Sequence, residues 1–338
     1  MPKHANIAVF VPHAGCSYKC SFCNQNEITG ITNPPDANEV KKEIESALIN
    51  LKTAPKDSEI AFFGGSFTMV ERSYMLSLLE AAYPFVKDGS VSGIRISTRP
   101  DGIDDEILGI LKEYGVTTVE LGAQSMDNKV LLANGRGHTA EDVIKASKLI
   151  KKYGFSLGLQ IMTGLYKSTP EKDFKTALKI IKLNPQCVRI YPTVVLKNSK
   201  LAEHYENGEY VPQTLEESVE ICAKILLLFE KSGIDVLRVG LHDSQSLCSE
   251  SVAGAYHPAF RELCESKIFE NLFVEKVKEQ NINNGDVIAE INPKSLSKFI
   301  GQRKTNLVKW EELGYNIQIK LNQNLDKYEL DLEVKQCF

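Results

Sequence analysis

The sequence predicts an α/β protein in which a complete or partial (β/α) barrel precedes a small C-terminal α+β domain. Short apolar, β-branched runs alternate with amphipathic stretches over about the first 240 residues. The strand-like runs are continuously apolar, as is typical of parallel strands that helices cover on the outside. After residue 243 this alternation stops. A doubly wound open sheet is the alternative, because alternation alone does not fix the order of strands.

The first part of the chain contains seven expected strands. They lie at Asn6–Pro12, Glu59–Phe63, Gly93–Thr98, Thr117–Gly122, Phe155–Met162, Cys187–Tyr191 and Asp235–Val239. Helices are expected between them, at 38–51, 71–82, 104–113, 139–153, 170–183 and 214–232. The first of these places Val40, Ile44 and Leu48 on one helical face.

The break in the alternation predicts three domains, a barrel at 1–243, an extension at 244–280 and a small α+β domain at 281–338. Residues 244–275 are irregular with one short helix, and polar residues 279–286 form a linker. The last part is expected to contain strand Val287–Ile291, helices Leu296–Ile300 and Asn306–Leu313, and strands Ile317–Leu321 and Glu329–Val334.

Composition excludes several classes of protein. The 338 residues are 43% hydrophobic and carry a net charge of -4, so the chain is globular and has no overall positive field for nucleic acid. The apolar run Ile7–Val11 is too short for a signal peptide, and no run is long enough to span a membrane. We therefore expect a soluble cytoplasmic protein.

Glycine and polar residues follow six of the expected strands. After the cysteine-rich loop that follows the first strand come Gly64-Gly65-Ser66, Ser97 to Asp101, Gly122 to Ser125, Thr163-Gly164 and Tyr191 to Thr193. In a parallel barrel the loops at the carboxyl ends of the strands meet at one rim. These motifs therefore predict a single composite site.

Three cysteines lie within eight residues, in the spacing C-x3-C-x2-C of Cys16, Cys20 and Cys23. Thiolates are the preferred ligands of iron–sulfur clusters, and three of them leave one iron of a four-iron cluster open to another ligand. A structural zinc site completed by His13 is the alternative, although no second pair of ligands follows. The scattered cysteines are expected to be small buried apolar residues; they are Cys187, Cys222, Cys248, Cys264 and Cys337.

The cysteine motif and five further motifs resemble the radical S-adenosylmethionine (SAM) superfamily, in its Elp3-like branch. The further motifs are Phe63 to Thr68, Ser97 to Asp101, Glu120 to Ser125, Asn134 to His138 and His257 to Phe260. The chain is also similar to oxygen-independent coproporphyrinogen oxidase-like proteins. The resemblance covers roughly residues 6–270 and implies a partial TIM-type barrel of the radical SAM kind.

The resemblance implies a radical SAM enzyme with two cofactors, a [4Fe–4S] cluster on Cys16, Cys20 and Cys23 and SAM on the open iron. It implies SAM contacts from the glycine motif and from a glutamine–arginine pair, and ribose contacts from the third and fifth strands. The residues at these positions are Gly64, Gly65, Ser66, Gln124, Arg136, Ser97 and Gln160. Relatives often carry acidic residues where this chain has Ser97, and Asp or His in place of Gln160. An electron donor of the flavodoxin or ferredoxin type is implied as well.

Three functions follow as alternatives. They are RNA (tRNA) modification, a radical reaction on a small tetrapyrrole-like or metabolic molecule, and RNA binding without catalysis. Gly301 to Lys304 resembles the GxxG loop with which KH domains hold nucleotides, with Lys304 in place of the second glycine. From these 338 residues we expect no acetyltransferase domain of the kind in full Elp3 proteins, and therefore no acetyl-CoA-dependent reaction. We expect structural roles for His138, His242 and His257.

Overall fold

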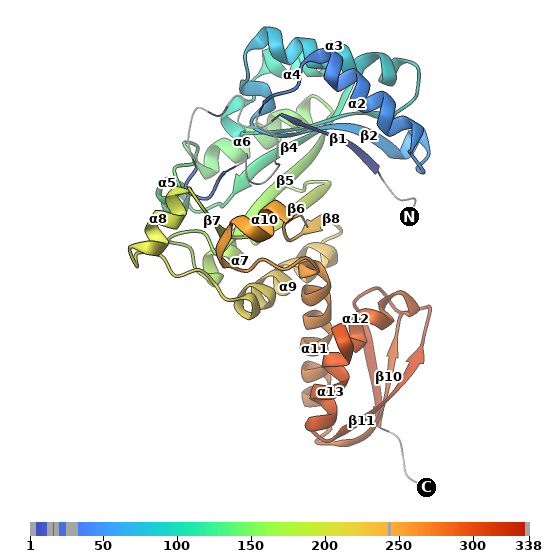
Figure 1. Cartoon of the computed structure of the whole chain (residues 1–338). Helices are drawn as coiled ribbons and strands as arrows, with labels where there is room; N and C mark the ends of the chain where they lie inside the picture. Colours follow the sequence, from blue (N-terminus) through green and yellow to red (C-terminus); the bar gives the residue numbers. More distant parts are fainter. Residues whose placement is uncertain (1–4, 12–15, 17–19, 25–32, 243–244, 335–338) are drawn as a thin grey trace.

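Seven parallel strands form one curved sheet in a computed structural model that describes residues 5–11, 16, 20–24, 33–242 and 245–334 (Figure 1). The strands are β1 (Ala5–Val11), β2 (Ser58–Gly64), β3 (Gly93–Thr98), β4 (Val116–Gln124), β5 (Ser156–Thr163), β6 (Cys187–Pro192) and β8 (Asp235–Val239). Their order in the sheet follows the chain, from β1 to β6 and then β8. This order confirms the partial barrel and excludes the doubly wound sheet, whose strand order reverses at a switch point.

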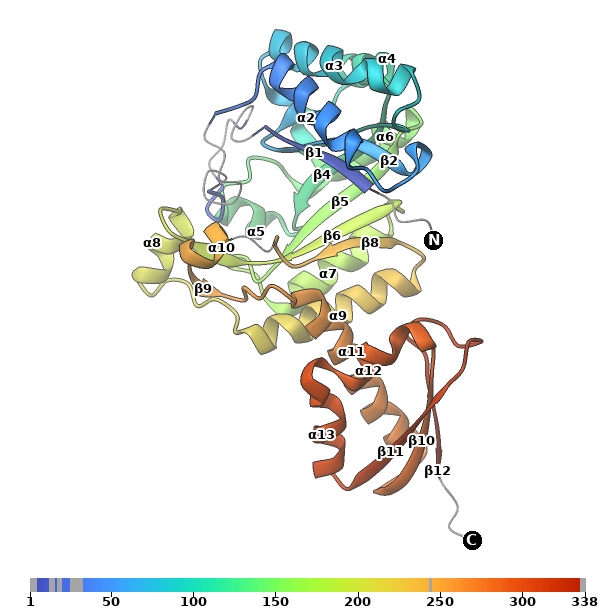
Figure 2. The ribbon, with the colours of Figure 1, turned by 45° about the vertical axis from the view of Figure 1, so that its right-hand side comes forward.

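Helices between the strands cover the outside of the sheet (Figures 1 and 2). They are α2 (Ala37–Ile49), α3 (Arg72–Lys87), α4 (Asp105–Glu113), α6 (Ala140–Lys152), α7 (Pro170–Ile181) and α9 (Leu215–Lys231). Capping boxes at Asp36, Thr139 and Thr214 fix where three of them begin, because side chain and backbone donors are satisfied reciprocally there. Two short helices were not predicted, α5 (Asn128–Ala133) and α8 (Lys200–Glu206).

The predicted extension is more regular than expected. β7 (Val194–Leu196) pairs antiparallel with β9 (Ser251–Gly254), and α10 (Gln245–Glu250) lies just before β9. The prediction of a short helix is wrong, because α11 (Phe260–Glu279) is 20 residues long. Its apolar residues face both α9 and the C-terminal sheet, so they do not form the single stripe by which an amphipathic helix is recognised.

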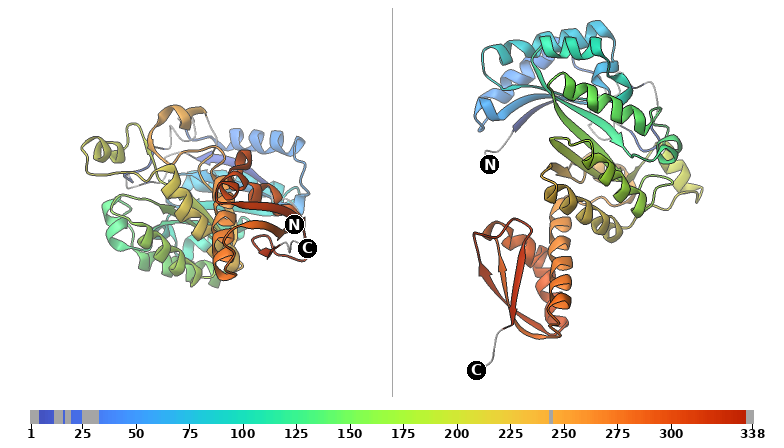
Figure 3. Two further views of the ribbon diagram at one scale, coloured as in Figure 1. Left: turned by 90° about the horizontal axis from the view of Figure 1, so that it is seen from below. Right: turned by 180° about the vertical axis from the view of Figure 1, so that it is seen from behind.

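The C-terminal unit is a three-stranded sheet packed against three helices. The central strand β10 (Gly285–Ile291) is parallel to β11 (Tyr315–Leu321) and antiparallel to β12 (Leu330–Val334). The short helices α12 (Leu296–Ile300) and α13 (Thr305–Glu312) and the long α11 cover it (Figure 3). The expected elements are thus present, within a few residues of their predicted bounds.

Helix α11 belongs to the cores of both parts of the molecule. Phe273 stacks on Trp310 of α13 at 4.3 Å between ring centroids, while Cys264 near the start of α11 is buried next to α9. Glu265 accepts a 2.7 Å hydrogen bond from Tyr328 and pairs with Lys298 at 3.2 Å. The apolar core is therefore continuous from the barrel into the C-terminal unit.

A buried network of charged residues fills the interior of the sheet. Glu120 on β4 accepts hydrogen bonds from Arg95 on β3 at 2.8 Å and from Arg189 on β6 at 2.7 and 3.1 Å. Arg95 also pairs with Glu59 at 2.8 Å. Burial alone would raise the pKa of Glu120, but the charge of Arg189, its hydrogen bond and the charge of Arg95 hold that pKa below its usual value. Each buried charge in this network is therefore stabilised by a partner of opposite charge.

Among the described residues, no helix combines the length and the apolar character that crossing a membrane requires.

We predict that Glu120→Gln lowers the free energy of unfolding by about 3 kcal/mol, because it leaves the buried Arg189 without a carboxylate and Arg95 with Glu59 alone. Denaturant unfolding near neutral pH measures the loss. The matched control is Glu106→Gln, whose exposed ion pair with Arg72 should contribute less than about 1 kcal/mol. The carboxylate of Glu120 has a lowered pKa, so its contribution is complete above the ordinary glutamate pKa and is lost as pH falls. Equal losses for the two variants would contradict this role.

Candidate functional site

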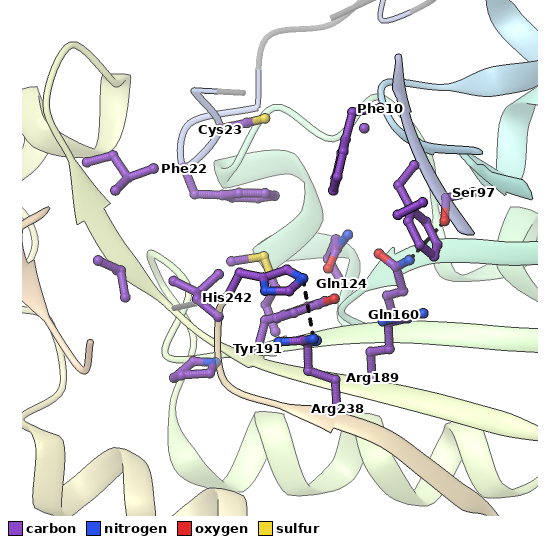
Figure 4. Close-up of a pocket in the computed structure, with 18 residues that line it drawn as sticks. Phe10, Phe22, Cys23, Ser97, Gln124, Gln160, Arg189, Tyr191, Arg238 and His242 are labelled. Carbon is purple, nitrogen blue, oxygen red and sulfur yellow. Dashed lines mark hydrogen bonds between the residues drawn. The ribbon is translucent and has the colours of Figure 1, made fainter. Parts of the chain in front are cut away.

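Two adjoining cavities open where the sheet strands end. The larger has a volume of about 750 Å³ and the smaller about 270 Å³. They share lining residues, which are Phe22, Cys23, Gly64, Ser97, Gln124 and Gln160. The structure therefore joins residues from the cysteine loop and from four strand ends at one place, as the strand-end motifs predict (Figure 4).

The three clustered cysteines all line the larger cavity. Cys16 is exposed and Cys20 is half-buried, while Arg136 donates a 3.0 Å hydrogen bond to the Cys20 sulfur. Within the described part of the chain, no three Cys, His, Asp or Glu side chains lie close enough to hold a single metal ion. Three thiolates are the donor set that a four-iron cluster takes when one iron stays open, whereas a structural zinc site takes four protein ligands, so the chemistry of the donor set fits a cluster. His13 of the zinc alternative lies outside the described residues.

The cysteine loop is clamped between two other segments at Ser21. Its amide donates to the carbonyl of Asn134 at 3.0 Å, and its hydroxyl donates to the Asn134 side-chain oxygen at 2.7 Å. The carbonyl of Ser21 accepts from the amide of Leu201 in α8 at 2.8 Å. The Asn134 amide group in turn donates to Tyr166 O at 2.9 Å. Both Ser21 and Asn134 are buried, so these hydrogen bonds fix the position of the cysteine loop next to Cys20.

The glycine motif after β2 divides into two roles. Gly64 has φ +110°, and a Cβ there would lie 2.9 Å from the carbonyl oxygen of Val11, so only glycine fits. Gly64 and Gly65 line the larger cavity. Ser66 is fully buried and does not line either cavity. Its hydroxyl accepts from the amide of Arg99 and bonds to Thr98, each at 3.1 Å. Ser66 therefore supports the wall and the glycines form its surface.

Gln124 and Arg136 lie together at the boundary of the cavities. Gln124 is held in the left-handed region at φ 61°, and its buried side-chain oxygen has no hydrogen-bond partner among the described residues. Arg136 donates to Gly122 O at 2.6 Å, and its buried Nε has no partner within the same part of the chain. A strained backbone and unsatisfied buried polar atoms together are typical of a ligand-binding position.

Ser97 and Gln160 connect the cavities to the buried charges. The Gln160 amide donates to Ser97 Oγ at 3.3 Å and to Glu120 Oε2 at 3.0 Å. Both residues line both cavities. The structure thus brings together all the predicted site residues except Ser66 at one surface.

The smaller cavity contains two arginines that sequence reasoning missed, Arg189 and Arg238. Aromatic rings and two guanidinium groups line it, from Phe10, Phe22, Phe63, Tyr191, Arg189 and Arg238. Nε2 of His242 lies 3.4 Å from an Arg238 nitrogen, which gives this histidine a place in the site rather than the expected structural role. The missed signal was an arginine inside each of two strands that were expected to be apolar.

The remaining candidates have structural positions. Burial and then the Arg136 charge lower the pKa of His138 to about 4, and its Nε2 lies 3.3 Å from Ala123 O. His257 Nδ1 accepts from the amide of Ala259 at 3.1 Å. Of the scattered cysteines, Cys187, Cys222 and Cys264 are buried as expected, but Cys248 is exposed and Cys337 lies outside the described residues.

Two known protein families match the chain. The Radical SAM superfamily matches residues 10–180, which is half of the chain, and the Radical_SAM C-terminal domain matches residues 185–270. A tRNA uridine(34) acetyltransferase of Methanocaldococcus jannaschii is 38% identical over 129 residues. That match covers 37% of this chain and 24% of the relative. The chain thus corresponds to a small part of that relative.

Two solved structures share the fold. Elp3 of Methanocaldococcus infernus with an N-terminal deletion has a TM-score of 0.62 at 22% identity, covering 83% of this chain and 64% of the other. Streptococcus suis SuiB bound to S-adenosylmethionine has a TM-score of 0.51 at 15% identity, covering 71% of this chain and 51% of the other. With a family match over half of its length, the chain belongs to the radical SAM superfamily and is an enzyme that uses a [4Fe–4S] cluster and SAM.

Proposed function

We propose that this enzyme modifies a base of RNA, with tRNA as the substrate, through a cluster held by Cys16, Cys20 and Cys23. The observation that carries the proposal is the larger cavity, which the three thiols, Arg136 and Gln124 line together. When bound, the cluster and SAM supply the chemistry of reductive SAM cleavage to a 5′-deoxyadenosyl radical. The protein orients the reactants and excludes water.

The residues of the cavity have distinct roles in the proposal. The cationic Arg136 beside the Cys20 sulfur stabilises negative charge on the thiolate and favours the reduced state of the cluster. The unsatisfied Gln124 oxygen would accept a hydrogen bond from SAM. Gly64 and Gly65 would let the backbone approach its methionine end. Ser97 and Gln160, which line both cavities, would contact its ribose.

Electron delivery comes from a flavodoxin or ferredoxin type of donor. An electron donor must come close to the cluster, and the exposure of Cys16 supports access from solvent. A cytoplasmic location is part of the same proposal, because that is where such a donor and tRNA are found together.

The C-terminal unit, which we propose as a KH-like domain, supports RNA as the substrate. Gly301 packs against α11, where a Cβ would lie 2.8 Å from Ser266 Oγ. Arg303 and Lys304 follow in the left-handed region, at φ 53° and 64°, and both are exposed. Neither forms an ion pair within the described part of the chain. Two strained, unpaired cations on one loop fit the phosphate backbone of RNA. The activity named for the M. jannaschii relative points to tRNA.

A small molecule is the second candidate substrate, favoured by the cavity of about 270 Å³, which mostly apolar and aromatic side chains line beside the cluster site. Binding of RNA without catalysis, the third interpretation of the sequence, does not agree with membership of an enzyme superfamily.

The decisive experiment is anaerobic reconstitution followed by an assay of 5′-deoxyadenosine with total tRNA present and absent. We expect the wild type to show the spectrum of a reduced [4Fe–4S] cluster and faster SAM cleavage with tRNA. A variant with Cys16, Cys20 and Cys23 all changed to Ser should lose both, because it lacks thiolate ligands. The matched control is Cys248→Ser at an exposed cysteine. Cleavage that tRNA does not change would favour the small molecule.

We predict that Asn134→Ala reduces the iron bound after reconstitution by about half or more, because the cysteine loop loses the Ser21 clamp. Iron and sulfide analysis measures the loss, and electron paramagnetic resonance reports the altered cluster. Asn316→Ala, an exposed position on β11, is the control. Wild-type iron content in Asn134→Ala would show that the clamp does not position the loop.

We predict that the double variant Arg303→Gln, Lys304→Gln binds tRNA about tenfold more weakly and with a smaller salt dependence, because two phosphate contacts are lost. Filter binding at several salt concentrations measures both. The control variant, Arg72→Gln with Lys148→Gln, removes the same charge from the barrel helices. These substitutions are preferable to deleting the C-terminal unit, since that deletion would expose the α11 core. Unchanged affinity would remove the loop from the RNA site.

A further inference from the structure

Arg238 carries a charge that the surrounding protein does not balance. Arg95 and Arg189 are paired with Glu59 and Glu120, but no carboxylate of the described residues pairs with Arg238. Within the described part of the chain, its guanidinium group has one polar contact, at 3.4 Å from Nε2 of His242. The lining of the smaller cavity contains no Asp or Glu. The guanidinium group is half-buried in a cavity whose described residues offer it no anion.

The pKa values of Arg189 and Arg238 differ in direction, because only Arg189 has a carboxylate partner. Burial disfavours the charged form of Arg189, yet the charge and hydrogen bonds of Glu120 raise its pKa above the usual value. Burial lowers the pKa of Arg238; Tyr191 opposes this effect, and the nearby Arg189 and Arg261 charges add to it. Burial and the Arg238 charge also lower the pKa of His242, which favours the neutral ring. The cavity thus has an excess of positive potential at one end.

The rest of the cavity wall is aromatic and apolar. Phe10 and Phe63 are 6.3 Å apart between ring centroids, and Arg189 stacks on Phe63 at 5.0 Å. Phe22 and Cys23 lie across the cavity from Arg189 and Arg238 (Figure 4). A ligand in this space would therefore meet rings along its body, the cysteine loop at one end and a cation at the other.

We propose that the smaller cavity binds the substrate as a flat aromatic or heteroaromatic group that carries one anionic group, which Arg238 binds. This inference rests on the proposed function, since it names the substrate class of the same site. Both a nucleotide of RNA, through its phosphate, and a small aromatic acid have this chemistry. Arg189 is held by Glu120 and forms part of the wall, so Arg238 determines the preference for an anion.

The test is isothermal titration calorimetry on anaerobic, cluster-loaded enzyme with SAM bound and no reductant. The probes are uridine 5′-monophosphate against uridine, and 4-hydroxyphenylacetate against its neutral amide. We expect one anionic probe to bind at least about tenfold more tightly than its neutral partner. The phosphate probe identifies a nucleotide as the source, and the carboxylate probe identifies a small acid.

Variants at one position then assign the effect. Arg238→Gln should abolish the preference for the anion, and Arg238→Lys should restore part of it because the charge is kept. Arg72→Gln removes an exposed arginine outside the site and should bind like the wild type. SAM affinity, measured in the same variants, shows whether the guanidinium group serves the SAM carboxylate instead.

Three results would overturn the inference: equal affinity for charged and neutral probes, no binding of either anion, or a loss of SAM affinity in Arg238→Gln as large as the loss of probe affinity. None of these outcomes concerns the proposed function itself. That function fails if the wild type neither assembles a cluster nor cleaves SAM, or if tRNA does not change the rate of SAM cleavage.

Discussion

The buried carboxylate of Glu120 is the constraint on which the interior of the barrel depends. It lies between Arg95 and Arg189, on neighbouring or nearby strands, and every one of these groups would be costly to bury alone. Gln160 bonds to the same carboxylate and to Ser97 at the edge of the cavities. The balance of charge inside the sheet therefore also fixes the side chains that form the floor of the site. A substitution of Glu120 would therefore affect the positions of Gln160 and Ser97 at the cavities as well as the stability of the core.

Much of the fold follows from the period and order of apolar residues. The seven strands and the long outer helices each bury one continuous surface, and such surfaces give clear patterns, as at Val40 and Ile44. α11 gave no such pattern because it is packed on two sides, with Cys264 toward the barrel and Phe273 toward the C-terminal sheet. α5 is too short to show a helical period of apolar residues, although Asp127 caps its N-terminus.

Site residues could be predicted where a sequence motif requires an unusual backbone conformation. They were harder to predict where side chains from distant segments come into contact. Gly64 could be expected from its motif, and the clash with Val11 supplies the reason. Ser66 belongs to the same motif but lies behind the cavity surface. Only its hydrogen bonds with Thr98 and Arg99 show this position. Arg238 could not be found from spacing, since its importance lies in the carboxylate that Arg189 has and Arg238 does not.

One short segment joins the position of the cysteine loop to the electrostatics of its sulfur atoms. Asn134 holds Ser21, and two residues later Arg136 reaches the Cys20 sulfur. Gly135 and Gly137, on either side of Arg136, have φ 63° and 67°, a region that residues with a Cβ rarely adopt. These turns let the chain bring both the Asn134 carbonyl and the Arg136 guanidinium group against the cysteine loop. A shift of this segment would therefore displace the loop and remove its cation together, so geometry and charge at the cysteine loop cannot vary independently.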